Sequence, residues 1–119
     1  AFMFACAKGY LDIVQYILKL SPNIINKKSN NKETALIIAA DNGKANIVQY
    51  LLDNGALNQI EDKTVNGFSA LYLASEYGHI EVCDILLNYY DEKGREKVYK
   101  VAKEKGNKEI LKLIQKKSK

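Results

Sequence analysis

Three side chains of this 119-residue sequence belong to the types that nucleophilic catalysis and metal binding use: His79, Cys6 and Cys83. An activated thiol or hydroxyl needs a base beside it, and the sequence places no such base near either cysteine. A structural zinc site takes about four ligands, which one histidine and two distant cysteines do not supply. The glycines also lack the spacing of a phosphate-binding loop. We therefore expect no catalytic site, no metal and no cofactor.

The charges of the chain are divided unevenly along its length. Residues 93–119 contain 11 basic and 3 acidic residues, a net charge of +8, whereas residues 1–92 carry a net charge of −4. Such a basic end can bind nucleic acid or an anionic membrane, or it can be the solvated face of a terminal element supported by i,i+4 pairs. Two such pairs are Glu96–Lys100 and Glu104–Lys108. Tyr99 is the one aromatic residue of this stretch, which leaves single-stranded nucleic acid without a stacking platform, and we expect neither nucleic acid nor a membrane as partner.

A helix pair is the element that must position these side chains. The stretch from Thr34 to Gly55, TALIIAADNGKANIVQYLLDNG, contains two apolar segments joined by a turn at Gly43. In the second segment apolar residues recur at i, i+1, i+4 and i+5, which places them on one face of a helix. These residues are Ile47, Val48, Leu51 and Leu52. Each segment is too short to be stable alone, so the two are predicted to pack as antiparallel helices.

The same pattern occurs four times. The glycines between the helices, Gly9, Gly43, Gly78 and Gly106, are separated by 34, 35 and 28 residues. An alanine precedes each of these glycines by four residues, and an apolar pair follows it. A period in this range that carries a helix pair each time is typical of a solenoid.

The pattern resembles the ankyrin repeat, whose motif reads roughly T-P-L-H-x-A-A-x-x-G-H-x-x-I-V-x-x-L-L-x-x-G-A. The second unit matches it at Thr34, Leu36, Ala39, Ala40, Gly43, Ile47, Val48, Leu51, Leu52, Gly55 and Ala56. The third unit matches at Leu71, Ala74, Gly78, His79, Val82, Leu86 and Leu87. The resemblance covers nearly the whole chain and implies an all-α solenoid of about four helix-turn-helix units with finger-like hairpin loops. It also implies a structural role for His79, at the start of a helix and packed on the turn between repeats.

We expect one ankyrin-repeat domain over residues 1–119, with repeats at approximately 1–33, 34–68 and 69–96 and a C-terminal cap at 97–119. The first finger has its tip at residues 29–32. The second finger, residues 57–68, has a reverse turn at Asn66-Gly67 and three extra residues, with Ile60 aligned on Ile25. The third finger is missing, so a direct connection should lead into the cap.

Two sets of apolar residues are expected at the ends of the stack. The inner face of the cap is predicted to consist of Val98, Val101, Ala102, Ile110, Leu111 and Ile114. At the other end Phe2, Met3 and Phe4 are expected to lie partly exposed. We therefore expect the chain to be a fragment of a longer protein with further repeats before Ala1.

The motif's proline and first histidine are absent from this sequence, and Tyr72 stands at the histidine position of the third unit. Apolar packing is expected to replace the hydrogen bonds that these residues make in the family. Both cysteines fall on apolar helix positions of different units, roughly 20 Å apart at about 10 Å per helix layer, too far for a disulfide. Buried, reduced thiols are typical of an intracellular protein, and we expect a cytoplasmic location.

The resemblance further implies a protein-binding surface made of finger tips and first-helix faces. In the second unit this surface consists of Asn30, Asn31, Glu33, Asp41 and Asn42. In the third unit it consists of Val65, Asn66, Phe68, Glu76 and Tyr77. Aromatic residues are favoured anchors of interfaces, which draws attention to Phe68 and Tyr77. The alternative is that Phe68 braces the finger and Tyr77 covers the neighbouring helix.

The function that this implies is non-catalytic recognition of an unidentified protein partner. Two alternatives stay open. One is electrostatic binding to nucleic acid or an anionic membrane through the basic C-terminal helix pair, which would weaken steeply with salt. The other is a purely structural role within a longer repeat array.

Overall fold

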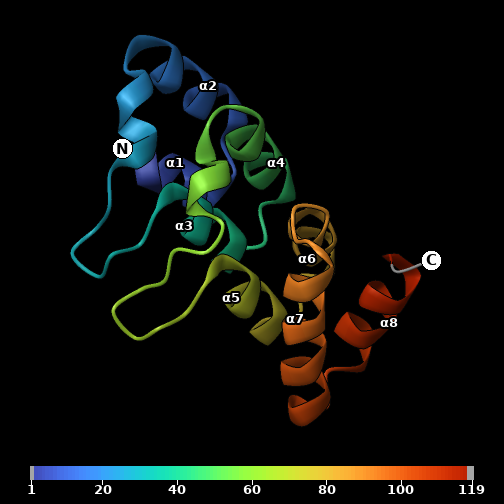
Figure 1. The fold of residues 1–119 in the computed structure, drawn as a ribbon. Coiled ribbons are helices and arrows are strands. Elements are labelled where there is room, and N and C mark those ends of the chain that lie inside the picture. Colours follow the sequence, from blue (N-terminus) through green and yellow to red (C-terminus); the bar gives the residue numbers. More distant parts are fainter. Residues whose placement is uncertain (1, 118–119) are drawn as a thin grey trace.

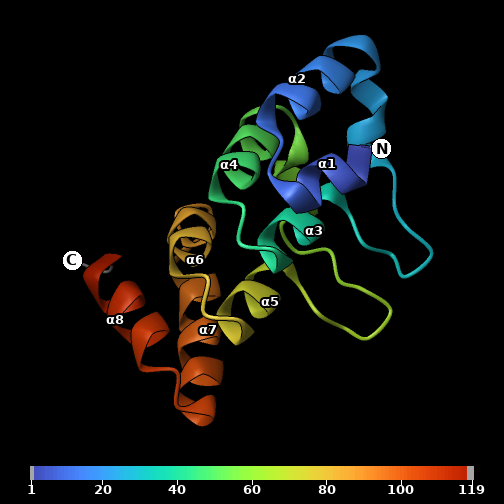
Figure 2. The same cartoon turned by 180° about the vertical axis from the view of Figure 1, so that it is seen from behind.

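The computed structural model describes residues 2–117, which form eight α-helices and two short 3₁₀ helices. The α-helices are α1 (Phe2–Lys8), α2 (Leu11–Leu20), α3 (Ala35–Asp41), α4 (Ala45–Asp53), α5 (Ala70–Glu76), α6 (Ile80–Leu87), α7 (Glu92–Lys105) and α8 (Lys108–Lys117). The 3₁₀ helices are η1 (Pro22–Asn26) and η2 (Ala56–Gln59). Helix pairs stack into an elongated body of 41 × 29 × 22 Å, and two finger-like loops project beside each other from it (Figures 1 and 2). The expected all-α solenoid with a terminal cap is confirmed.

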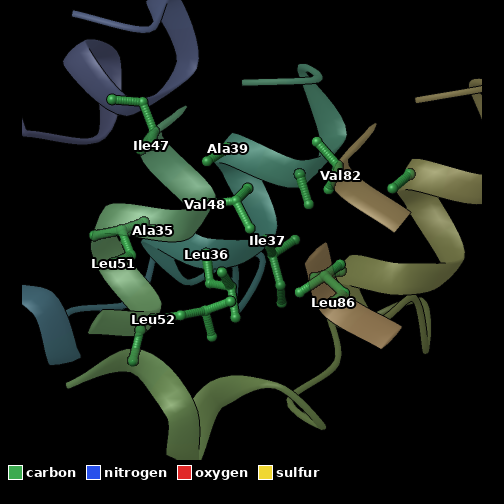
Figure 3. Packing of buried hydrophobic residues seen from close by; sticks show 14 of the residues in the cluster. Ala35, Leu36, Ile37, Ala39, Ile47, Val48, Leu51, Leu52, Val82 and Leu86 are labelled. Carbon is green, nitrogen blue, oxygen red and sulfur yellow. The ribbon is translucent and has the colours of Figure 1, made fainter. Parts of the chain in front are cut away.

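Two layers of helices enclose the core. Helices α1, α3 and α5 lie side by side in one layer, and α2, α4 and α6 lie side by side in the other. Their apolar faces form one continuous cluster. Figure 3 shows how side chains of three helices meet there: Leu36, Ile37, Val48, Leu52, Val82 and Leu86. The positions that the apolar spacing placed inside are therefore the ones that pack.

Hydroxyl side chains cap the N-termini of two first-layer helices, α3 and α5. The hydroxyl of Thr34 accepts a hydrogen bond from the backbone N–H of Ile37 at 3.1 Å, and that of Ser69 accepts one from Tyr72 at 3.1 Å. Serine and threonine are favoured at this position because they satisfy an N–H that has no partner within the helix. These caps hold the start of α3 and α5 without the family's proline and histidine.

The tips of both fingers are tight turns, as predicted. In the first, the N–H of Lys32 donates to the carbonyl of Ser29 at 2.9 Å. In the second, the N–H of Gly67 donates to the carbonyl of Thr64 at 2.9 Å. Gly67 has a φ of +82°, a left-handed conformation that glycine adopts without strain.

The expectation of three extra residues in the second finger, with Ile60 aligned on Ile25, is wrong. Residues 57–59 continue the 3₁₀ helix η2, which occupies the same place in its repeat as η1 does in the first. Gln59 takes the buried place of Ile25, and its side-chain Nε2 donates to the Ile25 carbonyl at 2.7 Å. Hydrogen bonding to a neighbouring repeat allows a polar residue in this apolar position.

The C-terminal pair differs from the prediction in three respects. Helix α7 already begins at Glu92, ahead of residue 97, although the short and direct connection from α6 is as expected. Val101 is 45% exposed rather than internal, because α7 packs chiefly against α8. The left-handed Gly106 ends α7, so Glu104 and Lys108 lie on separate helices.

The ion pairs of the structure also differ from the pairs predicted for the C-terminal helices. Within residues 2–117 the ion pairs are Lys28–Asp62 at 3.7 Å and Lys117–Asp84 at 2.7 Å, and the two expected i,i+4 pairs are not formed. The second pair joins α8 to α6.

At the N-terminal end Phe4 is 60% exposed as expected, whereas Phe2 is buried against the core.

Both cysteines are buried and unpaired, as predicted. Burial raises the pKa of Cys6 from 9.0 to about 12 and that of Cys83 to about 11. The Ser75 hydroxyl, 3.6 Å from the Cys83 sulfur, lowers the pKa of Cys83 and so opposes the effect of burial. Since the thiolate is the nucleophile, neither side chain is placed for thiol chemistry.

The turn between α3 and α4 is predicted to tolerate no side chain. Gly43 has a φ of +70°, and an added Cβ would lie 2.6 Å from Nδ1 of His79. Gly78 has the same conformation, with φ of +72°, but open space around it. Gly78→Ala should cost about 1–2 kcal/mol through left-handed strain alone. Gly43→Ala should lower the free energy of unfolding, measured in urea, by roughly 1–2 kcal/mol more than Gly78→Ala does, because the His79 ring must leave its hydrogen bond. Equal losses in the two variants would contradict this packing.

The thiols are predicted to react only after unfolding. In the unfolded chain they ionise above a pH of about 9, whereas the folded thiols stay neutral. Ellman's reagent should therefore label the folded protein much more slowly than the urea-unfolded protein. The free energy of unfolding should also fall as the pH rises above about 9, because the unfolded state then loses protons. Labelling at one rate in both states would show that the cysteines are accessible.

Candidate protein-binding surface

The two fingertips lie against each other. The backbone N–H of Val65 donates to the carbonyl of Asn31 at 3.0 Å. The Lys28–Asp62 ion pair joins the same two loops. Four of the residues predicted to bind a partner are therefore brought together on exposed, neighbouring turns: Asn30, Asn31, Val65 and Asn66. Val65 is 55% exposed, so the paired tips present an apolar side chain to solvent.

The bases of the fingers are more enclosed than the tips. Glu33 is half-buried and its carboxylate accepts a hydrogen bond from the Ser29 hydroxyl at 3.2 Å. Phe68 is half-buried and stacks on Tyr72, with ring centroids 4.9 Å apart and ring planes within 8°. This stack fastens the second finger to α5, and it leaves only part of Phe68 open to a partner. The apolar packing of the Tyr72 ring thus occupies the position at which the family has a histidine.

The remaining predicted residues lie at the opposite ends of α3 and α5. Asp41 and Asn42 end α3, and Glu76 and Tyr77 end α5. Seven residues of helix span about 10 Å at 1.5 Å per residue, so these residues form a second cluster apart from the fingertips. Tyr77 is 62% exposed there. The predicted surface is therefore two patches joined by the first-layer helices.

His79 has the structural role that the resemblance implied. It precedes α6, and its Nε2 lies 3.0 Å from the carbonyl oxygen of Asp41 in the preceding repeat. A carbonyl only accepts, so the proton of a neutral ring is on Nε2. The ring is consequently engaged in holding two turns together. Within residues 2–117 no group of three or more His, Cys, Asp or Glu side chains is arranged to bind a metal.

A groove between α5 and α7 was not anticipated from the sequence. It has a volume of about 810 Å³ and lies between the second finger, α5 and α7. Val98 and Val101, which were expected in the core, line it. The ammonium of Lys105 closes one end, donating to the Tyr72 hydroxyl at 2.8 Å and lying 4.3 Å from the ring centroid. This hydrogen bond raises the pKa of Lys105, which stays protonated.

Tyr90 lines the groove close to the start of α7. Burial raises the pKa of its hydroxyl, and the nearby charge of Glu61 raises it further. The phenol is therefore neutral and serves as part of the wall. The sequence contains one sign of this surface, a row of residues at i,i+4 spacing along α7. It does not show which side of this row is left uncovered by other helices. The row is Lys93, Lys97, Val101 and Lys105.

No helix within residues 2–117 combines the length and the apolar character that crossing a bilayer requires. Ionisable groups at the described surface are dominated by lysines of α7 and α8 and by scattered carboxylates of the repeats.

Comparison with known proteins gives one family. A profile described as ankyrin repeats (3 copies) matches residues 2–99. An ankyrin repeat and KH domain-containing protein of Caenorhabditis briggsae is 38% identical over 88 residues, which are 71% of this chain and 3% of that protein. A putative ankyrin repeat protein of Rickettsia bellii is 32% identical over 88 residues, 71% of this chain and 14% of that protein.

The human NAD-capped RNA hydrolase NUDT12 is also similar, with 36% identity over 85 residues. The match covers 70% of this chain but only 18% of the hydrolase. The chain thus spans a small part of each of these relatives, and what it shares with them is the repeat region. By sequence and by fold, the chain belongs to the ankyrin repeat family.

Proposed function

We propose that this chain is a non-catalytic module that binds a protein partner through its finger tips and the exposed faces of its first-layer helices. Ankyrin repeats are generally protein–protein interaction modules and are typically non-catalytic. The observation that carries the proposal for this chain is the hydrogen bond between Val65 and Asn31, which fixes the two fingertips as one surface. A preformed surface loses little conformational entropy on binding. The two buried thiols suit a reducing compartment, and we propose an intracellular, cytoplasmic location.

The basic C-terminal pair supports electrostatic binding less well. Lys117 is engaged with Asp84 and Asn88, and Lys105 with Tyr72. These contacts use two of the cations to hold helices together. Binding to nucleic acid or an anionic membrane is therefore an outcome to be tested against protein binding.

A structural role in a longer array has one specific observation in its favour. Ile13 of α2 and Ile47 of α4 occupy equivalent positions, but Ile13 is 48% exposed and Ile47 is completely buried. The side chain of Ile47 is covered by the preceding repeat, because α4 packs on α2. A further repeat placed before α1 would cover Ile13 in the same way, and it would partly cover Tyr16, whose equivalent Tyr50 is half-buried.

A double variant at the two exposed anchors is predicted to abolish partner binding. Val65→Ser with Tyr77→Ala removes apolar area from both patches and leaves the Phe68–Tyr72 stack in place. In an affinity pull-down from soluble cell extract, a protein retained at high salt should be lost with this variant, with affinity reduced roughly tenfold or more. Tyr16→Ala is the matched control, since Tyr16 is 64% exposed on α2, away from both patches.

Three results would count against the proposal. One is a high-salt partner that both variants retain equally. A second is a partner lost equally with Tyr16→Ala. The third is retention of only nucleic acid or acidic lipid at low salt, which would place the site on the basic pair instead.

An added repeat is predicted to stabilise the chain if it functions within an array. Fusing one consensus ankyrin repeat before Phe2 should raise the urea midpoint, because it buries the apolar face of α2. Ile13→Lys should remove most of this gain while changing the unfused chain by no more than about 0.5 kcal/mol. No gain on fusion would show that the face of α2 does not accept a neighbouring repeat.

A further inference from the structure

The α5–α7 groove arises where the regular stacking of the first layer is broken. Helix α3 packs along α1 and α5 packs along α3, whereas α7 packs chiefly against α8. Figure 1 shows α7 descending between α5 on one side and α8 on the other. The connection before α7 contains no finger, so α7 does not pack on α5 in the way that α5 packs on α3. A groove of about 810 Å³ remains between the two helices.

Apolar side chains line part of this groove. Val98 is half-buried and Val101 is 45% exposed, both on α7, and Leu71 and Tyr72 face them from α5. Covering such surface with a ligand is favourable in proportion to the apolar area that is removed from water. The groove volume falls in the range of about 300–1,000 Å³ that is usual for ligand sites.

The wall formed by α7 is basic. Lys93, Lys97 and Lys105 lie at i,i+4 spacings together with Val101, so they share one side of the helix. No carboxylate of residues 2–117 lies within 4.0 Å of Lys93 or Lys97, and both are exposed. Two cations without ion-pair partners beside an apolar strip are complementary to a ligand that carries carboxylates next to aliphatic groups.

The residues of the other walls distinguish between two classes of anionic ligand, nucleic acid and acidic peptide. Three carboxylates also line the groove, Glu61 on the second finger, Glu76 on α5 and Asp91 just before α7, together with one further lysine, Lys63 of the finger. A nucleic acid carries a phosphate at every nucleotide and would bring charge against these carboxylates. A peptide can carry its acidic residues on one side only, because alternate residues of an extended chain point in opposite directions.

The length of the groove limits the segment. Lys93 and Lys105 are separated by about 18 Å along α7 at 1.5 Å per residue. At about 3.3 Å per residue, five or six residues of extended peptide cover this distance. A whole partner helix, about 10–12 Å in diameter, is less suited to a space of this volume.

We propose that the α5–α7 groove binds a short, extended segment of a partner protein in which acidic and aliphatic residues alternate. Its carboxylates pair with Lys93 and Lys97, and its aliphatic side chains pack on Val98 and Val101. This rests on the protein-binding function proposed above and names the chemistry of the partner segment. The groove borders the second fingertip at Gly67 and the end of α5 at Glu76, but Lys93 and Lys97 lie on α7, so substitutions there test the groove without altering Val65 or Tyr77.

The test is fluorescence anisotropy with a labelled six-residue peptide of alternating Glu and Leu, compared with the same peptide carrying Gln in place of Glu. The intact chain should bind the acidic peptide at least several-fold more tightly. Lys93→Glu with Lys97→Glu should weaken this binding roughly tenfold or more. The matched control is Lys100→Glu with Lys103→Glu, which makes the same charge change at exposed residues of α7 outside the groove, and it should change binding little.

Val101→Ser should weaken binding of the acidic peptide without altering helicity, which is checked by circular dichroism for every variant. Three results would overturn the proposal. The first is equal affinity for the Glu and Gln peptides, and the second is an equal loss of peptide affinity in the groove and control variants. The third is displacement of the peptide by duplex DNA or phosphatidylserine vesicles that bind the same proteins more tightly than the peptide does. Each would leave the fingertip surface to be judged by the Val65 and Tyr77 variant, so failure here is distinguishable from failure of protein binding itself.

Discussion

Every helix of the repeats is too short to be stable alone, and packing on a neighbouring repeat is the interaction on which the whole structure depends. Helices of seven to ten residues gain too little from their own hydrogen bonds to offset the cost of nucleation. They form because apolar faces such as that of α4, with Ile47 and Leu51, are completely buried between α2 and α6. The turns follow from this constraint: Gly43 reverses the chain in the least space, and His79 joins that turn to the next one.

The same constraint makes the two ends of the stack different from its middle. At the first repeat no helix of residues 2–117 covers the face of α2 that points away from α4, and Ile13 stays half exposed. At the other end, α7 and α8 are long and polar, and they bury little beyond Ala102, Ile110 and Ile114. Contacts of α8 with α6, including the pair between Lys117 and Asp84, fix the cap in place. Because α8 makes this attachment, α7 is free to stand away from α5, and the groove follows.

Local patterns made most of the fold predictable, whereas the features that depend on tertiary placement were not. The glycine period located the turns, and the apolar spacing identified the buried faces of α4 and α6. Gln59 shows the limit of such patterns: it is polar by type but buried, because a carbonyl of the preceding repeat lies within hydrogen-bonding distance. Val101 shows the converse, since its side chain is apolar but is 45% exposed. Of the candidate site, the pairing of the fingertips follows from repeat stacking. The enclosure of Phe68 instead depends on how its ring stacks on that of Tyr72, four residues later, which residue types alone do not determine.

Tyr72 connects these observations. It stands where the family has a histidine, and the lost hydrogen bonds are replaced by the stack with Phe68 on one side and by the contact with Lys105 on the other. One side chain of α5 therefore touches both the second finger and the end of α7. A ligand in the α5–α7 groove that displaced Lys105 would remove one of the two supports of this ring, and the finger rests on the other. The departure from the family motif is thus also the link between the second finger and the groove, the two candidate surfaces of this chain.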